Sequence, residues 1–180
     1  MRIQRSECIA LCIDVQDRLF PHIDENSNLE VQCIKLLQGL GFLDVPVLLS
    51  EQYPKGLGPT ILSIREILDA QQPLLKSCFS CADDDAIRQE TERSGRKTLI
   101  VFGIEAHVCV MQTVIDFRAR GYSVVVVADC IGSRSSSDKL IALERMRYEG
   151  AILATCESLL FELCRDTGTE VFKKLSGIIK

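Results

Sequence analysis

Short apolar runs alternate with amphipathic stretches along the whole sequence. The runs are rich in β-branched residues and cover residues 8–13, 45–49, 98–102, 123–127 and 151–154. Runs that are apolar on both faces are typical of central strands in a parallel sheet that helices cover on each side. The shorter piece 73–75 is a candidate for a further strand.

Between the runs, apolar residues recur every three or four positions, which is the spacing of one helix face. The pattern predicts helices over residues 28–42, 83–95, 106–117, 135–148, 156–164 and 170–179. Acidic residues at 83–85 suit the positive end of a helix dipole, Ser135 and Asp138 resemble a capping box, and Gly121 is placed to end a helix. Alternating strands and helices predict one doubly wound α/β domain over residues 1–180.

Composition and charge exclude several classes of protein. Hydrophobic residues make up 47% of the chain and charged residues 26%, which is typical of a globular domain. The net charge of −4 argues against a nucleic-acid binder, which needs a cationic surplus. No apolar run reaches the roughly 18 residues of a membrane span, and the first run ends at Asp14 without a cleavage site, so it is interpreted as a strand and not a signal peptide. We expect neither a nucleic-acid nor a membrane partner.

The nine cysteines bear on the compartment. Their number is odd, and many stand inside the apolar runs, where cysteine behaves as a small hydrophobic residue. This usage indicates a reducing compartment and predicts a cytoplasmic protein, with an organelle as an open alternative.

Three reactive side chains follow the ends of predicted strands. Asp14 closes the first strand, Lys76 follows residues 73–75, and Cys109 stands in the opening turn of the helix after residues 98–102. The carboxyl ends of parallel strands meet at one edge of a sheet. A helix start and a nearby lysine each lower the pKa of a thiol, and a carboxylate can accept the thiol proton. This set predicts a nucleophilic cysteine, against the alternative of an ordinary helix cap and a core thiol.

Other motifs carry less chemistry. The sequence lacks the glycine-rich loops that bind dinucleotides or nucleoside phosphates, and we expect no cofactor. Cys78 and Cys81 form a Cys-x-x-Cys pair, but zinc needs four ligands and no second pair is present, so plain buried thiols are favoured over a zinc or redox pair. His107 stands two positions from Cys109, and residues so spaced on a helix do not face one another.

The sequences around the reactive residues resemble those of the isochorismatase-like cysteine hydrolases. Three blocks match in order: Ile-Asp-Val-Gln at residues 13–16, Lys-Ser-Cys-Phe-Ser at 76–80 and Gly-Ile-Glu-Ala-His-Val-Cys-Val at 103–110. Residues 50–58 and 128–137 are similar to the isochorismatase domain-containing proteins of eukaryotes. The resemblance covers essentially the whole chain.

The resemblance implies a role for each matched residue. It makes Asp14 the general base, Lys76 the invariant lysine and Cys109 the nucleophile. It also implies that the backbone N–H groups of Ala106 and Cys109 form an oxyanion hole. A further implication is a non-proline cis peptide bond between Ile104 and Glu105. Oxyanion donors of this kind typically contribute about 10²–10³ in rate.

Departures from the family narrow the expected activity. Nicotinamidases of this family bind a metal through Asp-x-His after the second strand, where this chain has Glu51-Gln52-Tyr53, and its only histidines are His22 and His107. We therefore expect no catalytic metal. Isochorismatases proper lack the cysteine. Candidates for the substrate pocket are Gln16, Phe20, Gln52, Tyr53, Phe79 and Glu105.

These observations predict a three-layer Rossmann-like fold with a six-stranded parallel sheet in the order 3-2-1-4-5-6. In that order the first and fourth strands are neighbours, which brings Asp14 and Cys109 together. The expected function is a small-molecule cysteine hydrolase that cleaves an amide-type C–N bond through a thioester. The resemblance implies a homo-oligomer, a dimer or a tetramer. The alternative function is a catalytically silent scaffold or partner-binding protein; the acidic balance disfavours a nuclease.

Overall fold

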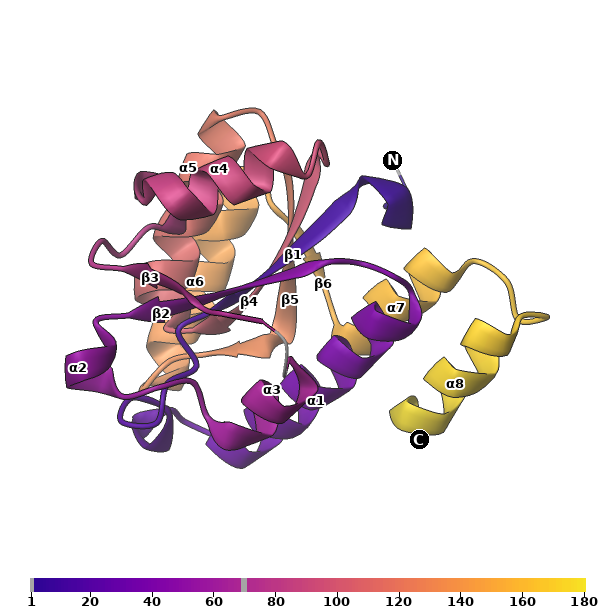
Figure 1. The fold of residues 1–180 in the computed structure, drawn as a ribbon, viewed down its shortest axis with the longest axis horizontal. Coiled ribbons are helices and arrows are strands. Elements are labelled where there is room, and N and C mark those ends of the chain that lie inside the picture. Colours follow the sequence, from indigo (N-terminus) through magenta and orange to yellow (C-terminus); the bar gives the residue numbers. More distant parts are fainter. Residues whose placement is uncertain (1, 69–70) are drawn as a thin grey trace.

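A computed structural model describes residues 2–68 and 71–180 (Figure 1). In these residues six parallel strands form one sheet in the order β3-β2-β1-β4-β5-β6, which confirms the predicted fold class and strand order. The strands are β1 (Cys8–Ile13), β2 (Val47–Gln52), β3 (Leu74–Lys76), β4 (Thr98–Ile104), β5 (Ser123–Gly132) and β6 (Ile152–Ala154). The expectation of one domain over residues 1–180 stays a prediction, and residues 1, 69 and 70 lie outside the described part.

Helices cover both faces of the sheet (Figure 1). One layer contains α1 (Asn26–Phe42), α3 (Leu62–Ile67), α7 (Cys156–Cys164) and α8 (Glu170–Ile179). The other contains α4 (Asp85–Arg93), α5 (Met111–Ala119) and α6 (Ser136–Tyr148). Every residue of β1 is buried, because this central strand has a helix layer on each side. Among the described helices, none combines the length and apolarity that a membrane crossing requires.

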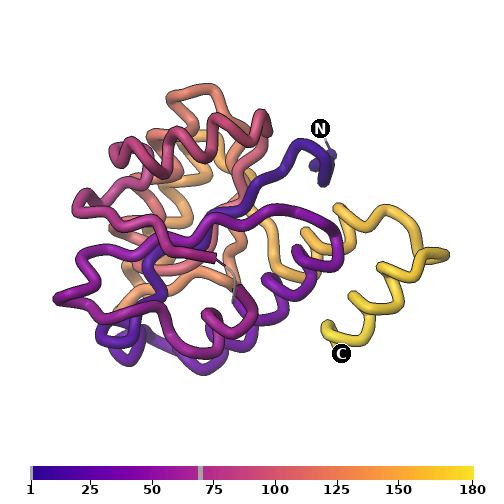
Figure 2. The backbone as a smooth tube through the Cα atoms, viewed as in Figure 1, coloured from indigo at the N-terminus to yellow at the C-terminus, as the bar shows by residue number. Residues whose placement is uncertain are grey.

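The N-terminal segment runs beside the connection between α7 and α8 (Figure 2). The N–H group of Ile3 donates to Glu162 Oε1 at 2.7 Å, and Arg165 donates to the carbonyl of Ile3 at 3.1 Å. Short 3-10 helices precede β1, follow it and follow β3: η1 (Arg5–Glu7), η2 (Phe20–His22) and η3 (Cys81–Asp83).

Several helix boundaries differ from the predicted ones. The helix expected from residue 106 begins as a π-helix, η4 (Ala106–Val110), and continues as α5. The capping box predicted at Ser135 is wrong, because its hydroxyl pairs with that of Ser137 at 2.7 Å and caps no backbone group. By contrast, Asp84 caps α4 by accepting from two backbone N–H groups. The sequence pattern missed α3 and the four-residue α2 (Pro54–Leu57).

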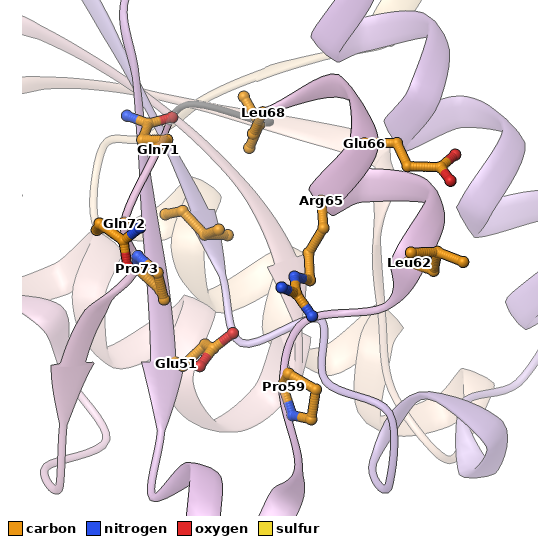
Figure 3. A pocket seen from close by; sticks show the side chains of 10 residues that line it. Glu51, Pro59, Leu62, Arg65, Glu66, Leu68, Gln71, Gln72 and Pro73 are labelled. Atoms are coloured by element: carbon orange, nitrogen blue, oxygen red, sulfur yellow. The ribbon is translucent and has the colours of Figure 1, made fainter.

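Successive residues of β2 point to opposite sides of the sheet, as expected for a strand. Glu51 lines a cavity of about 370 Å³ between β2, α3 and the segment that leads into β3 (Figure 3). Its Oε1 atom accepts from the N–H group and the hydroxyl of Thr60, at 2.7 and 2.8 Å. The side chains of Ser50 and Gln52 lie on the other side of the sheet, where Ser50 contacts Asp14 and Gln52 contacts Lys76.

Gly103 lets β4 approach β1 where both strands end. It pairs with Ile13 and has a φ of +116°. A Cβ atom on Gly103 would overlap the backbone nitrogen and carbonyl of Ile13, the residue directly before Asp14. Because only glycine avoids both the strained φ and this overlap, Gly103 fixes the position at which Asp14 leaves the sheet.

Gly103→Ala is therefore expected to lower the free energy of unfolding by about 3 kcal/mol. Urea unfolding followed by circular dichroism measures the change. Gly41→Ala is the matched control, since a Cβ atom in that part of α1 meets no other atom within 4 Å. The control is expected to be as stable as the wild type or more stable by about 0.5–1 kcal/mol. A Gly103→Ala variant with wild-type stability would contradict the close approach of the two strands.

Candidate active site

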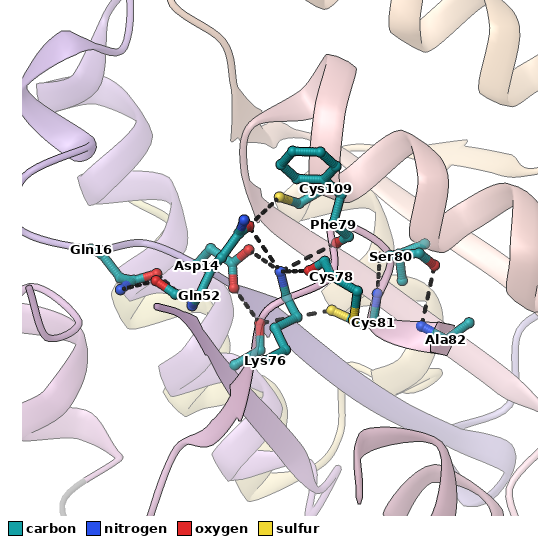
Figure 4. A network of polar contacts seen from close by, with 12 residues as sticks. Asp14, Gln16, Gln52, Lys76, Cys78, Phe79, Ser80, Cys81, Ala82 and Cys109 are labelled. Atoms are coloured by element: carbon teal, nitrogen blue, oxygen red, sulfur yellow. Dashed lines mark hydrogen bonds and ion pairs between the residues drawn. The ribbon is translucent and has the colours of Figure 1, made fainter. Parts of the chain in front are cut away.

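The carboxyl edge of the sheet brings Asp14, Lys76 and Cys109 together, and we call these three residues the reactive cluster (Figure 4). Asp14 follows β1, Lys76 ends β3, and Cys109 stands in η4. Lys76 Nζ lies 2.5 Å from Asp14 Oδ2, and both side chains are fully buried. Because β2 separates β1 from β3 in the sheet, the lysine side chain reaches across the end of β2 to make this ion pair.

Asp14 is fixed by its backbone as well as by its partners. It has a left-handed φ of 51°, a conformation that aspartate tolerates better than most residues. Its N–H group donates to the carbonyl of Ser50 at 3.2 Å, and its Oδ1 accepts from the Ser50 hydroxyl at 2.7 Å. Sequence reasoning missed Ser50. The only signal for it was a small polar residue directly after the apolar run 45–49.

Lys76 Nζ has four acceptors within hydrogen-bond distance. In addition to Asp14, they are Gln52 Oε1 at 3.2 Å, the carbonyl of Cys78 at 3.1 Å and the carbonyl of Phe79 at 3.2 Å. An ammonium group carries three hydrogens, so each of them has an acceptor. These contacts hold the nitrogen at one position beside Asp14.

The charge of Lys76 is maintained despite its burial. Burial by itself disfavours the ammonium form and lowers the pKa. The attraction and the hydrogen bond of Asp14 outweigh this effect, and the pKa of Lys76 lies above its usual value. The lysine is therefore a fixed positive charge at neutral pH.

Cys109 is 4% exposed, and its thiol donates to Gln52 Oε1 at 3.1 Å. Burial raises the pKa of this thiol well above its ordinary value, Asp14 raises it further, and Lys76 lowers it. The expectation of a lowered thiol pKa is therefore wrong for the resting structure, because a helix start and one lysine do not offset burial beside a carboxylate. The resting site therefore favours the protonated thiol over the thiolate.

The residues before Cys109 form the first turn of η4. The peptide bond between Ile104 and Glu105 is cis. The carbonyl of Glu105 accepts from the N–H groups of Val108 and Val110, at 3.1 and 3.2 Å. Ala106 and Cys109 belong to the same five-residue element, and their role as an oxyanion hole stays a prediction.

Gln16 holds the end of β2 in place. It is fully buried, and its Oε1 accepts from the N–H group of Gln52 at 2.8 Å. Its Nε2 donates to the carbonyls of Gln52 and Gly58, at 3.0 and 2.7 Å. Both ends of the Gln16 amide are thus bonded to backbone, so the structure places this pocket candidate as a support for Gln52.

The other pocket candidates lie at different depths. Tyr53 and Phe79 are 62% and 52% exposed, and both adjoin the reactive cluster through backbone hydrogen bonds to Lys76. Phe20 is buried in η2 as part of the core. The carboxylate of Glu105 is buried and makes its ion pair with Arg134.

His107 does not serve the thiol. Its Nδ1 lies 2.9 Å from the Ser133 hydroxyl, and its Nε2 lies 3.5 Å from Glu105 Oε2. Both ring nitrogens therefore face groups other than Cys109, as its spacing along the helix predicts.

The metal site of nicotinamidases does not fit this chain. Of the two residues at the corresponding positions, Glu51 binds Thr60 and points into the cavity behind β2, and Tyr53 is an exposed phenol. Throughout residues 2–68 and 71–180, no three histidine, cysteine, aspartate or glutamate side chains are grouped so that they could hold a metal ion. The donor set that such a centre requires is not assembled here.

A comparison of the sequence with known families identifies the family to which this fold belongs. The family model of the isochorismatase domain matches residues 8–158. The chain belongs to the isochorismatase family. Isochorismatase domain-containing protein 2A from Mus musculus is 40% identical over 181 residues, which cover 99% of this chain and 84% of that protein. Isochorismatase domain-containing protein 1 from Salmo salar is 39% identical over 172 residues, which cover 96% of this chain and 60% of the salmon protein's length.

Solved structures with the same architecture include a MAR1 ribonuclease from Caenorhabditis elegans. It has a TM-score of 0.91 and 31% identity, and the match covers 99% of this isochorismatase-family chain and 92% of that one. The YcaC gene product from Escherichia coli, an octameric hydrolase of unknown specificity, has a TM-score of 0.94 and 21% identity, with 99% and 89% covered. At 21% identity, the similarity to the E. coli protein shows the fold alone. This protein therefore has the fold of the isochorismatase-family hydrolases.

Proposed function

We propose that this isochorismatase-family protein is a small-molecule hydrolase with Cys109 as its nucleophile, Asp14 as its base and an amide-type C–N bond as its target. The observation that carries the proposal is the convergence of a fully buried Lys76–Asp14 ion pair with the Cys109 thiol. A buried ion pair contributes little to stability when it is compared with apolar side chains of similar volume, so its presence beside a thiol points to chemistry.

The reaction has two steps. In the first, Cys109 Sγ bonds to the carbonyl carbon, the thiol proton passes to Asp14, the C–N bond breaks, and Asp14 gives the proton to the leaving nitrogen. In the second, a water oxygen attacks the thioester while Asp14 takes its proton, the C–S bond breaks, and the proton returns to the sulfur. The N–H groups of Ala106 and Cys109 hold the negative oxygen in both steps.

The raised pKa of the thiol supports this order of events. Because burial and Asp14 keep the sulfur protonated at rest, the proton leaves during the attack and not before it. Lys76 stays charged and lowers the cost of the negative charge that the sulfur gains. The same arrangement keeps the free enzyme unreactive toward electrophiles that do not fill the site.

Asp14→Asn is expected to separate thiol reactivity from turnover. The substitution removes the charge that raises the pKa of Cys109 and leaves Lys76, which lowers it. The pKa of the thiol therefore falls. Alkylation by iodoacetamide at pH 8 becomes faster by about tenfold for each unit by which this pKa falls, because the thiolate fraction rises in proportion. Amide turnover falls by about 10²–10⁴ because the base is lost.

Mass spectrometry of digested protein measures the alkylation at each cysteine. Asp17→Asn, which changes an exposed aspartate three positions away, is the control and is expected to leave both rates unchanged. Slower alkylation of Cys109 in Asp14→Asn than in the wild type would contradict the balance of charges around the thiol.

Ammonia release from a panel of small carboxamides tests the proposed activity. Acrylamide belongs in the panel as an electrophilic probe, since the structure of YcaC from Pseudomonas aeruginosa holds it covalently. Turnover of one amide together with a covalent adduct at Cys109 supports the proposal. The absence of both for every amide would favour a catalytically silent scaffold.

A second candidate activity is cleavage of RNA, which the name of the C. elegans structure favours. An open groove of about 860 Å³ carries Arg2, Arg5 and Arg165, and arginine is a residue that contacts RNA phosphates. This groove adjoins the start of β1, whereas Asp14 follows the end of that strand. The groove and the reactive cluster thus lie at opposite ends of β1, so RNA cleavage by the reactive cluster would require a strand that spans this length or another binding surface.

We further propose that the protein forms a homo-oligomer, a dimer or a tetramer. The octameric assembly of the E. coli neighbour supports assembly in general, without fixing the number of copies. Tyr53 and Phe79, more than half exposed beside the reactive cluster, are aromatic side chains that a second copy would cover.

A further inference from the structure

The side-chain amide of Gln52 has a fixed orientation. Its Oε1 accepts from Cys109 Sγ at 3.1 Å and from Lys76 Nζ at 3.2 Å (Figure 4). The reversed orientation would place the NH₂ group against the lysine ammonium, two donors facing each other with no acceptor between them. The charge of Lys76 therefore decides which end of the amide faces the reactive cluster.

The NH₂ group of Gln52 is left without a partner in the described part of the chain. Both of the side chain's hydrogen bonds use the oxygen. Every fully buried side-chain nitrogen or oxygen within residues 2–68 and 71–180 has a hydrogen-bond partner, so an unpartnered Nε2 retains access to solvent. Two N–H hydrogens thus remain available for an acceptor, on the same planar group whose oxygen touches the nucleophilic sulfur.

The backbone of Gln52 is as well fixed as its side chain. Gln16 bonds to both its N–H and its carbonyl, and its neighbour in β3 is Lys76 itself. A donor held in this way loses little conformational entropy when it binds an acceptor. Because its position is fixed, it favours substrates that place an acceptor at that position.

We propose that the NH₂ group of Gln52 determines specificity by binding a second acceptor oxygen of the substrate. This inference rests on the proposed amide hydrolysis. There the scissile carbonyl oxygen is held by the N–H groups of Ala106 and Cys109, so the Gln52 donor is available to a different atom. The preferred substrates are small amides with another oxygen, a carbonyl or a carboxylate, on the carbon next to the scissile carbonyl.

Two amides of nearly equal size test the inference, propanamide and 2-oxopropanamide, which differ in one carbonyl oxygen at the neighbouring carbon. The quantity measured is the ratio of their kcat/KM values from ammonia release. Intrinsic reactivity of the keto-amide is common to all variants, so it cancels when the ratio is compared between them. In Gln52→Met the preference for 2-oxopropanamide is expected to fall by about tenfold or more, since one hydrogen bond to the substrate is lost.

Gln52→Glu is the second variant. It keeps an oxygen for Lys76 and Cys109 but replaces the donor with an acceptor, so the preference is expected to fall at least as far as in Gln52→Met. A residue that only positions the thiol would lower kcat for both amides and leave the ratio unchanged, and that result would overturn the inference. If wild-type protein releases ammonia from neither amide nor from any other in the panel, the proposed function itself fails, and this inference falls with it.

Discussion

Cys109→Ala is expected to abolish amide hydrolysis, with a fall in kcat of about 10⁴ or more. The nucleophile, the base and the lysine act as one unit, so loss of the nucleophile removes nearly all of the rate that the covalent pathway provides. Only the smaller rate acceleration from substrate binding and oxyanion contacts remains. The substitution removes little volume from a site at the edge of the sheet, so the variant is expected to fold. The same variant forms no adduct at position 109 with acrylamide or iodoacetamide.

Cys164→Ala is the control for this prediction. That thiol is partly exposed at the end of α7, away from the carboxyl edge of the sheet, and it is expected to be dispensable. Ammonia release and the mass of the intact protein are measured for both variants. Amide turnover in Cys109→Ala at more than a few per cent of the wild-type rate would contradict the role of the thiol. A single-stranded RNA that both proteins cleave equally well would show a nuclease activity independent of the reactive cluster.

Lys76→Met has the second large expected effect, a fall of about 3–5 kcal/mol in the free energy of unfolding. The side chains of Lys76 and Asp14 are both fully buried, so removal of the ammonium leaves a carboxylate in the interior with no opposite charge beside it. It also leaves the carbonyls of Cys78 and Phe79 without the donor that they share. Urea unfolding at pH 7 measures the loss.

A double variant separates the ion pair from simple packing. Asp14→Asn combined with Lys76→Met removes both charges, and it is expected to be more stable than Lys76→Met alone. The sum of the two single losses should therefore exceed the loss in the double variant. Purely additive losses would mean that the two charges do not interact in the folded state.

The sequence pattern predicted those parts of the fold in which both faces of an element are buried. The runs at 8–13 and 98–102 correspond to β1 and β4, because a strand between two helix layers needs apolar residues at every position. Elements of four and six residues, α2 and α3, are too short to show a helical period. The prediction of a cap at Ser135 was wrong because the hydroxyls of Ser135 and Ser137 bond to each other. The spacing of residues along the sequence does not reveal such a pairing.

At the candidate site, motif positions located the three reactive residues but not the residues that hold them. Ser50 and Gln16 act on partners 36 residues away, and these contacts depend on the register between β1 and β2. The direction of the thiol pKa was mistaken for a related reason. A local argument from the helix start includes Lys76 as a neighbour but not the burial of Cys109 beside Asp14.

β3 consists of three residues at the outer margin of the sheet and pairs with β2 alone. Its last rung is Gln52 opposite Lys76, which supplies the amide oxygen that touches the sulfur and the ammonium group that holds this oxygen. Short marginal strands open more readily than central ones, through local fluctuations that leave the rest of the molecule folded. Enzymatic activity would then be lost at a denaturant concentration at which the core is still folded. A loss of activity would therefore measure the opening of the Gln52–Lys76 pair and not the unfolding of the whole domain.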